Sequence, residues 1–304
     1  MPYDLVIAGG GPSGFSAALA LGRARKRVLL CDSGPRRNAR AERIQNFVTR
    51  DGTPPDEFRR IAREQLAAYP SVEVRDEPVV AIAGERGAFR VEVGSGAVDA
   101  RRVLLCTGLI DELPELEGFR ELWGRSIFQC PYCHGWEARD RPWGYLARPA
   151  NLGHLVPFAL QMQGWTSEVV VFTNGSFELP VDARAQLERG GIAVHTAPVK
   201  RLIGGAHALE AIELESGARV RCEALFAHPP QRQVELVRAL GVELDEEGFV
   251  RVDPMRGETS MPGVFAAGDL TSRMQGAVIG AAAGMRAAAM INGELAMEGG
   301  PGGG

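Results

Sequence analysis

Two cysteines separated by two residues are the part of this sequence best suited to chemistry. Cys130 and Cys133 lie in the segment Cys-Pro-Tyr-Cys-His. This spacing allows a reducible disulfide, and the cysteines of such pairs often have depressed pKa values. The same spacing can form half of a zinc site, which needs a second pair of ligands. Cys222 stands alone and the sequence has no suitably spaced histidine pair, so we expect a redox pair and no metal.

The residue after the second cysteine bears on how the pair handles protons. Imidazole titrates near neutral pH, so His134 can accept or donate a proton beside the thiols. The alternative is a histidine that is only solvated or hydrogen-bonded next to the pair. The remaining cysteines lie in apolar, strand-like runs, and we expect Cys31, Cys106 and Cys222 to be buried as small hydrophobic side chains.

A glycine-rich turn near the N-terminus has the Gly-x-Gly-x-x-Gly spacing of a dinucleotide-binding fingerprint. The turn contains Gly9, Gly11, Pro12, Ser13 and Gly14. Such glycines allow backbone N–H groups to approach a pyrophosphate, and the N-terminus of a following helix stabilises the anion. Asp32 follows where a carboxylate can accept hydrogen bonds from a ribose 2′-OH.

This turn needs a strand before it and a helix after it. The apolar run at residues 5–8 predicts the strand, and the small and apolar spacing at residues 15–25 predicts the helix. A second region of this kind is predicted from a strand at 143–147, a helix at 152–163 and a strand at 169–172. Units of this kind build parallel sheets. We therefore expect an α/β protein with two Rossmann-like, three-layer domains.

Residues 264–269 read as a strand that ends in Gly268 and Asp269, and a helix begins near Gln275. This segment resembles the C-terminal FAD segment of the pyridine nucleotide-disulfide reductase superfamily, in which the aspartate binds the ribityl and phosphate region. In that superfamily, the helix that follows the aspartate directs its N-terminus at the flavin. The resemblance implies that the fingerprint binds FAD, with Gly268, Asp269 and Gln275 as further contacts. The alternative is that Asp269 only caps a helix.

Together these motifs resemble the low-molecular-weight thioredoxin reductase family over nearly the whole chain. The matching residues are 9–14, 45–47, 107–108, 130–133, and 265–269 with Gln275. The resemblance implies a homodimer whose FAD domain is interrupted by a central domain that carries the cysteines. It assigns Cys133 to the flavin side and Cys130 to the attack on substrate. It also implies cofactor contacts from Asn46, Thr107 and Gly108.

The linkers and the resemblance together define the expected domains. These are a FAD-binding domain at residues 1–112 and 230–296, a central NAD(P)-like domain at 113–229, and a disordered tail at 297–304. A linker is expected around residues 226–231. The Ala- and Gly-rich segment 276–290 predicts a buried helix.

The chain departs from the family where NADPH should bind. The central domain needs a second glycine-rich turn after its first strand, but residues 147–152 read Ala-Arg-Pro-Ala-Asn-Leu. Ala147 and Pro149 would crowd a pyrophosphate, and proline has no N–H to donate. The strand at 169–172 should be followed by arginines for a 2′-phosphate, and no basic residue follows it directly. We infer that the nucleotide site is degraded and that NADPH is not bound in the family's manner.

Several functions remain open. The first is a FAD-dependent, thioredoxin reductase-like enzyme that acts on a thioredoxin-like protein or a small disulfide, with a ferredoxin or flavodoxin as electron donor. The second is a dithiol oxidase that uses O₂. The extended motif Cys-Pro-Tyr-Cys-His-Gly-Trp-Glu resembles a branch that includes such oxidases of small natural products, with His134 in place of the usual acidic residue. The third is a conventional NADPH-dependent reductase. A non-enzymatic redox sensor is disfavoured, because the cysteine pair has little use without turnover.

Composition narrows the partners. The formal net charge is −4 over 304 residues and there is no polybasic run, so we expect no nucleic acid and no anionic membrane as partner. No run of 18 apolar residues predicts a membrane span. The first residues lack the features of a signal peptide, so we expect a cytoplasmic protein. Tyr132, Trp136 and Trp143 are expected to be packing residues, the alternative being aromatic side chains that stack on the flavin.

Overall fold

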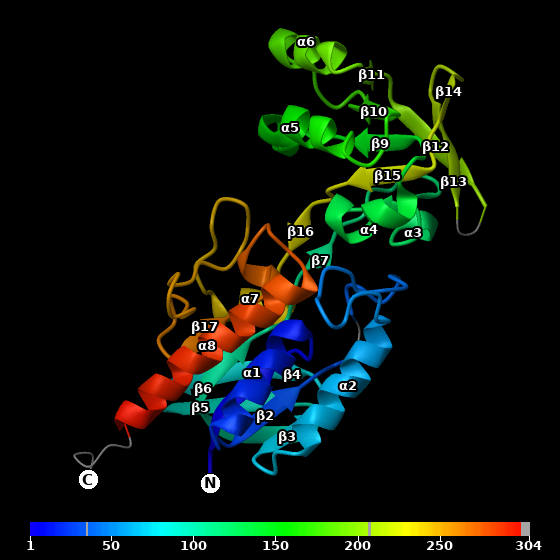
Figure 1. Ribbon diagram of the computed structural model, residues 1–304. Helices are drawn as coiled ribbons and strands as arrows, with labels where there is room; N and C mark the ends of the chain where they lie inside the picture. Colours follow the sequence, from blue (N-terminus) through cyan, green and yellow to red (C-terminus); the bar gives the residue numbers. More distant parts are fainter. Residues whose placement is uncertain (35, 206–207, 299–304) are drawn as a thin grey trace. The chain divides into compact units, whose positions relative to one another are not determined.

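The computed structural model describes residues 1–34, 36–205 and 208–298. It divides into two compact units, the first made of residues 1–111 and the chain from residue 231 onward, and the second of residues 112–230. The first unit is thus discontinuous in sequence, and the second is inserted into it (Figure 1). These boundaries lie one residue from those expected at 112/113 and 229/230.

The first unit is an α/β fold whose strands form one large sheet. Its elements are β1 (Tyr3–Ala8), α1 (Pro12–Arg23), β2 (Val28–Cys31), α2 (Pro55–Ala67), β3 (Val72–Arg75), β4 (Val79–Glu85), β5 (Ala88–Val93), β6 (Gly96–Leu105), β7 (Ile110–Asp111), β16 (Gln231–Arg232), α7 (Glu235–Leu240), β17 (Val264–Ala266), the 3-10 turn η2 (Asp269–Thr271) and α8 (Ala277–Glu298).

Parallel pairing brings the ends of four strands to one edge of this sheet. The order is β3-β2-β1-β6-β5-β4, and β17 also pairs with β6. Ala8 lies opposite Cys31 on β2 and opposite Leu105 on β6, and Leu105 also faces Ala266 on β17. The segments that follow β1, β2, β6 and β17 therefore emerge side by side, and each carries predicted site residues.

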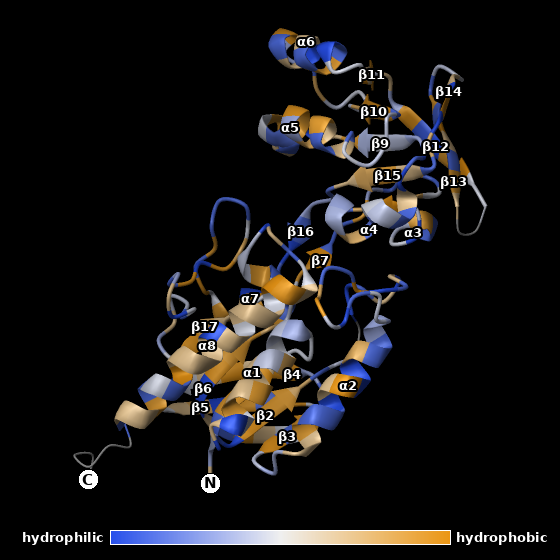
Figure 2. Cartoon of the chain, viewed as in Figure 1, coloured by the Kyte–Doolittle hydropathy of each residue, from blue (hydrophilic) through white to orange (hydrophobic). Residues whose placement is uncertain are grey.

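Two apolar layers cover the two faces of the sheet. On one face, side chains of β1 and β6 pack against α1 and α8, and on the other they pack against the β4–β5 arm and α7. Figure 2 shows hydrophobic colours along the central strands and many hydrophilic residues on the outer helix α2. A three-layer domain follows, as expected.

Helix α8 differs from its prediction as a buried helix. Gly280, Ala281 and Gly284 are buried, but Val278 and Met285 are exposed, so only one face is covered. A Cβ added at Gly284 would lie 2.0 Å from the carbonyl oxygen of Ser13, which explains why glycine stands where α8 crosses α1. The helix also continues to Glu298, so residues 297 and 298 belong to it and not to the expected tail; residues 299–304 lie outside the described residues.

The second unit is a smaller α/β fold with an added antiparallel sheet. Its elements are α3 (Phe119–Leu122), β8 (Ile127–Phe128), α4 (Pro131–Ala138), β9 (Trp143–Leu146), the 3-10 turn η1 (Pro149–Asn151), α5 (Leu152–Met162), β10 (Val169–Phe172), α6 (Val181–Arg189), β11 (Ala193–His195), β12 (Val199–Gly204), β13 (Leu209–Leu214), β14 (Arg219–Arg221) and β15 (Ala224–Ala227).

Its parallel sheet has the order β11-β10-β9-β15-β8. Helices α5 and α6 pack on one face, and α3 with the antiparallel sheet β12-β13-β14 packs on the other. The linker expected around residues 226–231 is wrong in its first part, because Phe226 and Ala227 belong to the fully buried strand β15. Strand β15 lies between β9 and β8 in this sheet, and the sequence pattern did not reveal that pairing.

Candidate functional site

The cysteines of the redox motif lie at the start of α4 in the second unit. Cys130 is the N-cap of this helix, and Pro131 occupies the first turn, where its missing N–H costs no hydrogen bond. The Sγ of Cys130 accepts the backbone N–H of Cys133 at 3.2 Å, and the two Sγ atoms lie 2.6 Å apart. A single helical turn therefore brings both sulfurs together.

The position of Cys130 stabilises its thiolate. The hydrogen bond from the Cys133 thiol makes the largest contribution, and the backbone N–H groups of Cys133 and Tyr132 add to it. Together they lower the pKa of Cys130 to about 7, although burial acts in the opposite direction. A substantial fraction of Cys130 is therefore a thiolate, the nucleophilic form, at neutral pH.

His134 follows the pair on the same helix. Its ring stacks on Phe128 with the centroids 4.3 Å apart, and it is half-buried. Burial lowers the pKa of His134 to about 4, partly opposed by a hydrogen bond with the backbone of Cys130. Its Nδ1 atom has no hydrogen-bond partner among the described residues. At neutral pH the ring is thus a neutral imidazole, and its low pKa makes it a weak base there.

In the first unit, the glycines of the fingerprint have different structural reasons. A Cβ added at Gly9 would lie 2.3 Å from the carbonyl oxygen of Cys106, and one at Gly14 would lie 2.0 Å from that of Gly9. Close packing therefore requires both glycines. A Cβ added at Gly11 would meet no atom within 4 Å. Gly11 is the N-cap of α1. Among the described residues, no side chain caps this helix and no atom fills the space beside Gly11, so the N-terminus of α1 faces open space.

Asp32 lies at the end of β2, beside this turn. A Cβ added at Gly10 would lie 2.6 Å from Oδ2 of Asp32, so turn and carboxylate are in close contact. Asp32 is buried, its Oδ1 accepts the N–H of Gly34 at 3.2 Å, and its Oδ2 is paired with Arg59 of α2. Arg59 also donates to the carbonyl oxygen of Gly10 at 2.8 Å. The carboxylate is therefore held in a fixed position at the mouth of the turn.

The second predicted cofactor segment forms a polar cluster around Arg37. Its guanidinium donates two hydrogen bonds to Asp111, both 2.8 Å long, and one to Oδ2 of Asp269 at 3.0 Å. It also donates to the side-chain oxygen of Gln275, whose amide group donates to Gln231. Burial raises the pKa of Asp269, and Arg37 opposes that shift. The structure thus brings Asp269 and Gln275 together, with Gly268 preceding them at φ +100°.

Of the remaining predicted contacts, Thr107, Gly108 and Ser13 lie along the same edge, and Asn46 lies in a separate loop. Thr107 and Gly108 follow β6, and a Cβ added at Gly108 would meet no atom within 4 Å. The Oγ of Ser13 lies 3.3 Å from the Sγ of Cys106 in the buried interior. Asn46 is exposed with φ +61°, and its N–H donates to Asp51 at 2.7 Å. Asn46 belongs to a loop closed by the bridge between Ile44 and Thr53.

The other cysteines behave as predicted. Cys31, Cys106 and Cys222 are buried, and burial raises the pKa of each thiol to about 12. They are therefore inert thiols at neutral pH. Within the described residues there is no group of three or more side chains arranged to hold a metal ion.

Helix length and polarity bear on membrane insertion. None of the helices in the described part of the chain is both long enough and apolar enough to span a bilayer.

Sequence reasoning missed three residues of the first unit. Arg37, Arg59 and Asp111 hold the predicted residues in place, yet they belong to no fingerprint. The pair Arg36-Arg37 lies in the loop after the second strand, shortly beyond Asp32, and could have indicated a cation near the cofactor. No sequence signal separates Arg59 from the other basic residues of α2.

Comparisons with known proteins agree with this geometry. The family model described as pyridine nucleotide-disulphide oxidoreductase matches residues 3–284. Thioredoxin reductase aclD of Aspergillus oryzae is 31% identical, with 97% of each chain covered, and thioredoxin reductase sirT of Leptosphaeria maculans is 30% identical, covering 95% of this chain and 93% of the relative. The crystal structure of an oxidoreductase from Agrobacterium tumefaciens is 35% identical with a TM-score of 0.89, and covers 98% of this chain and 99% of its own. The chain belongs to the pyridine nucleotide-disulphide oxidoreductase family.

Within that family it is a thioredoxin reductase-like, FAD-dependent disulfide oxidoreductase. The residues of the first unit fit this cofactor. The uncapped N-terminus of α1 with open space at Gly11 suits a pyrophosphate, and the fixed carboxylate of Asp32 suits a ribose. The cluster of Arg37, Asp269 and Gln275 offers donors and acceptors at the same strand edge.

Proposed function

We propose that this enzyme exchanges electrons between FAD and an external dithiol or disulfide through Cys130 and Cys133, without using NADPH. The observation that carries the second half of the proposal is the segment after β9, where the family requires a dinucleotide-binding turn. Ala147 is buried there, and Pro149 begins the 3-10 turn η1. Arg148 donates to the carbonyl oxygen of His228 at 2.7 Å. This backbone offers neither the glycines nor the sequence of N–H groups that a pyrophosphate needs.

The end of β10 supports the same conclusion. Thr173 is fully buried, and the side-chain oxygen of Asn174 accepts the N–H of Val199 at 2.7 Å. The Asn174 amide thus faces the protein's own backbone, and no arginine stands at this position. A 2′-phosphate would therefore lack its usual cationic partner.

The exchange at the pair balances as two thiol–disulfide steps. In the reductive direction the Cys130 thiolate attacks one sulfur of the external disulfide, whose other sulfur leaves as a thiolate and takes a proton. Cys133, once deprotonated, then attacks Cys130 in the mixed disulfide, and the second external sulfur leaves. Two electrons pass from the pair to the external molecule, and the reverse sequence oxidises an external dithiol. FAD, when bound, supplies a two-electron acceptor or donor for the pair.

The two cysteines have different parts in these steps. The lowered pKa of Cys130 supports its assignment as the thiol that meets the external molecule. Cys133 is then the thiol that exchanges electrons with the flavin. We propose that His134, which follows Cys133 on α4, passes protons between the pair and its surroundings during the exchange. Because its pKa is about 4, the imidazole does not hold the proton that a thiol releases.

The direction of electron flow defines two candidate functions. The names of the relatives favour reduction of a thioredoxin-like protein, for which a ferredoxin or flavodoxin would be the electron donor. The extended motif Cys-Pro-Tyr-Cys-His-Gly-Trp-Glu favours the second candidate, a dithiol oxidase that passes electrons to O₂, because it resembles a branch that includes such oxidases. A homodimer remains a prediction from the family resemblance, and a cytoplasmic location remains a prediction from the sequence.

One experiment separates these candidates. The FAD-loaded protein is mixed anaerobically with NADPH, NADH, reduced ferredoxin or dithiothreitol, and flavin absorbance is followed before air is admitted. Bleaching by dithiothreitol with peroxide formed in air supports the oxidase. Bleaching by reduced ferredoxin followed by transfer to a disulfide supports the reductase. Rapid bleaching by NADPH would refute the proposal that the cofactor site is degraded.

A further inference from the structure

Two aromatic side chains on the helix of the redox pair face solvent. Tyr132 is 61% exposed and Trp136 is 67% exposed, whereas Trp143 is fully buried. The expectation of packing residues is therefore confirmed for Trp143, whereas the rings of Tyr132 and Trp136 are only partly covered. Aromatic side chains contribute most when they bury their large apolar area, so two exposed rings beside a reactive pair point to a binding role.

Helix geometry places these rings next to the cysteines. Tyr132 and Trp136 are four residues apart on α4 and so lie on one face of the helix. At about 100° per residue, Trp136 points in a direction between those of Tyr132 and Cys133, one turn further along. A molecule whose sulfur reaches the pair would therefore pass along these rings.

Neighbouring side chains hold both rings in place. The hydroxyl of Tyr132 accepts a hydrogen bond from Gln161 at 2.7 Å, and its ring meets that of Trp165 edge-on with the centroids 5.4 Å apart. The guanidinium of Arg139 lies 4.0 Å from the centre of the Trp136 ring and also donates to the backbone carbonyl of Trp136. Fixed rings lose little conformational entropy when a ligand stacks on them.

We propose that Tyr132 and Trp136 form an aromatic platform that recognises the substrate of the pair, and that this substrate is a small dithiol or disulfide bearing a flat apolar ring. The inference rests on the proposed exchange at Cys130 and Cys133 and names its substrate class. The platform adds no covalent step, because it binds the ring while the sulfurs react as described.

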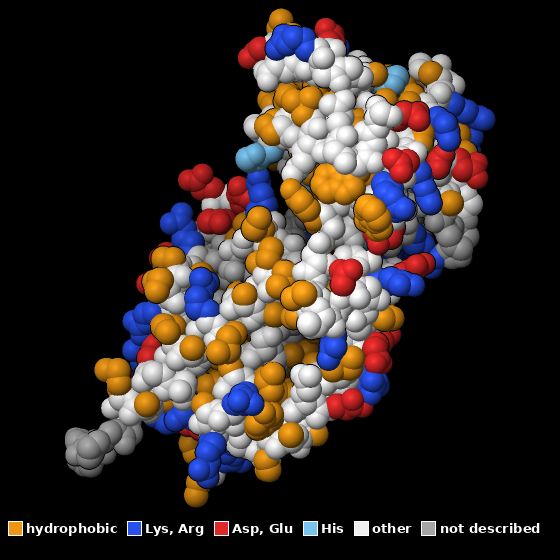
Figure 3. All heavy atoms as spheres, viewed as in Figure 1, with side chains coloured by type: hydrophobic (Ala, Val, Ile, Leu, Met, Phe, Trp, Pro, Cys, Tyr) orange, Lys and Arg blue, Asp and Glu red, His pale blue; other side chains and the backbone are white. Residues whose placement is uncertain are grey.

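The extent of the apolar surface favours a small molecule over a protein. In the described part of the second unit, the other large hydrophobic side chains with exposed surfaces are Leu160 on α5 and Val181 on α6. A specific protein interface buries about 800 Å² per partner around an apolar centre. Figure 3 shows hydrophobic side chains at the surface over α4 beside charged ones. Two exposed aromatic rings surrounded by charged side chains therefore suit a single flat ligand better than a protein partner.

The test compares two dithiols that differ in the ring. Anaerobic bleaching of the FAD-loaded full chain is measured with ortho-xylylenedithiol, which carries a benzene ring, and with dithiothreitol, which does not. Trp136→Ala should raise the apparent KM for the aromatic dithiol roughly three- to tenfold and leave that for dithiothreitol unchanged. Trp136→Phe should restore part of the loss. Val181→Ala removes exposed apolar surface elsewhere in the unit and should change neither value.

A binding measurement separates the platform from the chemistry. The bis-S-methyl ether of ortho-xylylenedithiol has no thiol, so calorimetric titration with it reports stacking alone. Binding that weakens in Trp136→Ala supports the platform. No binding to the wild type, or equal KM changes for both dithiols, overturns it. If Trp136→Ala impairs only the reaction with a thioredoxin-type protein, the surface binds proteins and the proposal is wrong. Failure of both dithiols to bleach the flavin would refute the proposed function while the titration still decides the platform.

Discussion

The backbone N–H of Cys133 donates to the sulfur of Cys130 at 3.2 Å, so the second residue of the pair stabilises the thiolate of the first. The thiol of Cys133 also points at that sulfur, and this hydrogen bond is the largest contribution to the low pKa of Cys130. The reactivity of Cys130 is therefore a property of the first turn of α4, and it can be measured without a substrate.

Alkylation of the reduced protein by iodoacetamide measures that reactivity directly. The rate at Cys130 should rise with a midpoint near pH 7, because its pKa is lowered to about 7. In Cys133→Ala the midpoint should move upward, since the largest stabilising hydrogen bond is lost. The buried cysteines provide an internal control, because thiols with a pKa of about 12 should stay unmodified. A wild-type midpoint near the ordinary value of 9.0 would contradict this account.

Gly11 provides a test of the cofactor site. Because a Cβ at Gly11 meets no protein atom within 4 Å, Gly11→Ala should fold normally as apoprotein but retain FAD poorly, with Kd raised about tenfold or more. Flavin fluorescence after gel filtration measures retention. Gly153→Ala adds the same methyl group to open space in the first turn of α5 and should retain FAD fully. Equal retention in both variants would show that no phosphate approaches Gly11.

Acid stability should depend on His134. Its pKa is lowered to about 4 in the fold from an ordinary value of 6.5, so the unfolded chain binds this proton more tightly. This difference in proton binding contributes fully to the free energy of unfolding above pH 6.5. The contribution, up to about 3 kcal/mol, is lost as the pH falls from 6.5 through 4. His134→Phe keeps a ring to stack on Phe128 but cannot be protonated. Its Tm should therefore fall less than that of the wild type on acidification, and parallel Tm curves would refute the shift.

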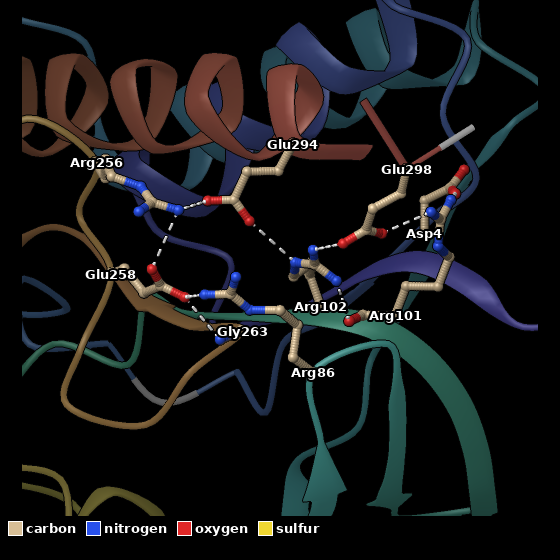
Figure 4. Close-up of polar contacts among 9 residues, drawn as sticks. All are labelled: Asp4, Arg86, Arg101, Arg102, Arg256, Glu258, Gly263, Glu294 and Glu298. Carbon is tan, nitrogen blue, oxygen red and sulfur yellow. Dashed lines mark hydrogen bonds and ion pairs between the residues drawn. The ribbon is translucent and has the colours of Figure 1, made fainter. Parts of the chain in front are cut away.

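Strand β6 and helix α8 of the first unit are joined by a cluster of ion pairs around a buried arginine (Figure 4). Arg102 on β6 is fully buried and pairs with Glu294 at 3.3 Å and with Glu298, both on α8. Arg102→Met leaves two carboxylates without their shared cation. The expected cost is on the order of 2 kcal/mol, less than for a fully enclosed pair, because both glutamates keep some exposure.

Thermal unfolding checks the role of Arg102, with a fall in Tm of several degrees expected. Arg90→Met is the control, because the pair of Arg90 and Asp99 is exposed and should contribute little. Equal Tm values for Arg102→Met and the wild type would show that the cluster does not stabilise the fold.

Local patterns predicted the elements that hold the site. Strand β2 occurs at residues 28–31, where an apolar run ends at Asp32, and helix α1 follows the glycine turn because a proline at its first position suits a helix start. The fold class followed from these repeated units, whereas the order of the domains needed the linkers and the family resemblance as well. In the second unit, the missing glycines of 147–152 were also visible in the sequence.

Long-range pairing and exposure were not predictable in the same way. Arg37 meets Asp111 and Asp269, which are distant in sequence and become neighbours only when β6 and β17 pair. An aromatic residue gives the same sequence signal whether it is buried or exposed. Trp143 on β9 faces the core, whereas Trp136 on α4 faces solvent. Only the packing of these two elements in the folded unit distinguishes the two residues.

The most direct test of the central claim is a stopped-flow comparison of NADPH and dithiothreitol as reductants of the bound flavin, made anaerobically on the same preparation. We predict that dithiothreitol bleaches the flavin, that Cys130→Ser abolishes this bleaching, and that NADPH causes none on the same timescale. Rapid bleaching by NADPH, or dithiothreitol bleaching that persists in Cys130→Ser, would contradict the account.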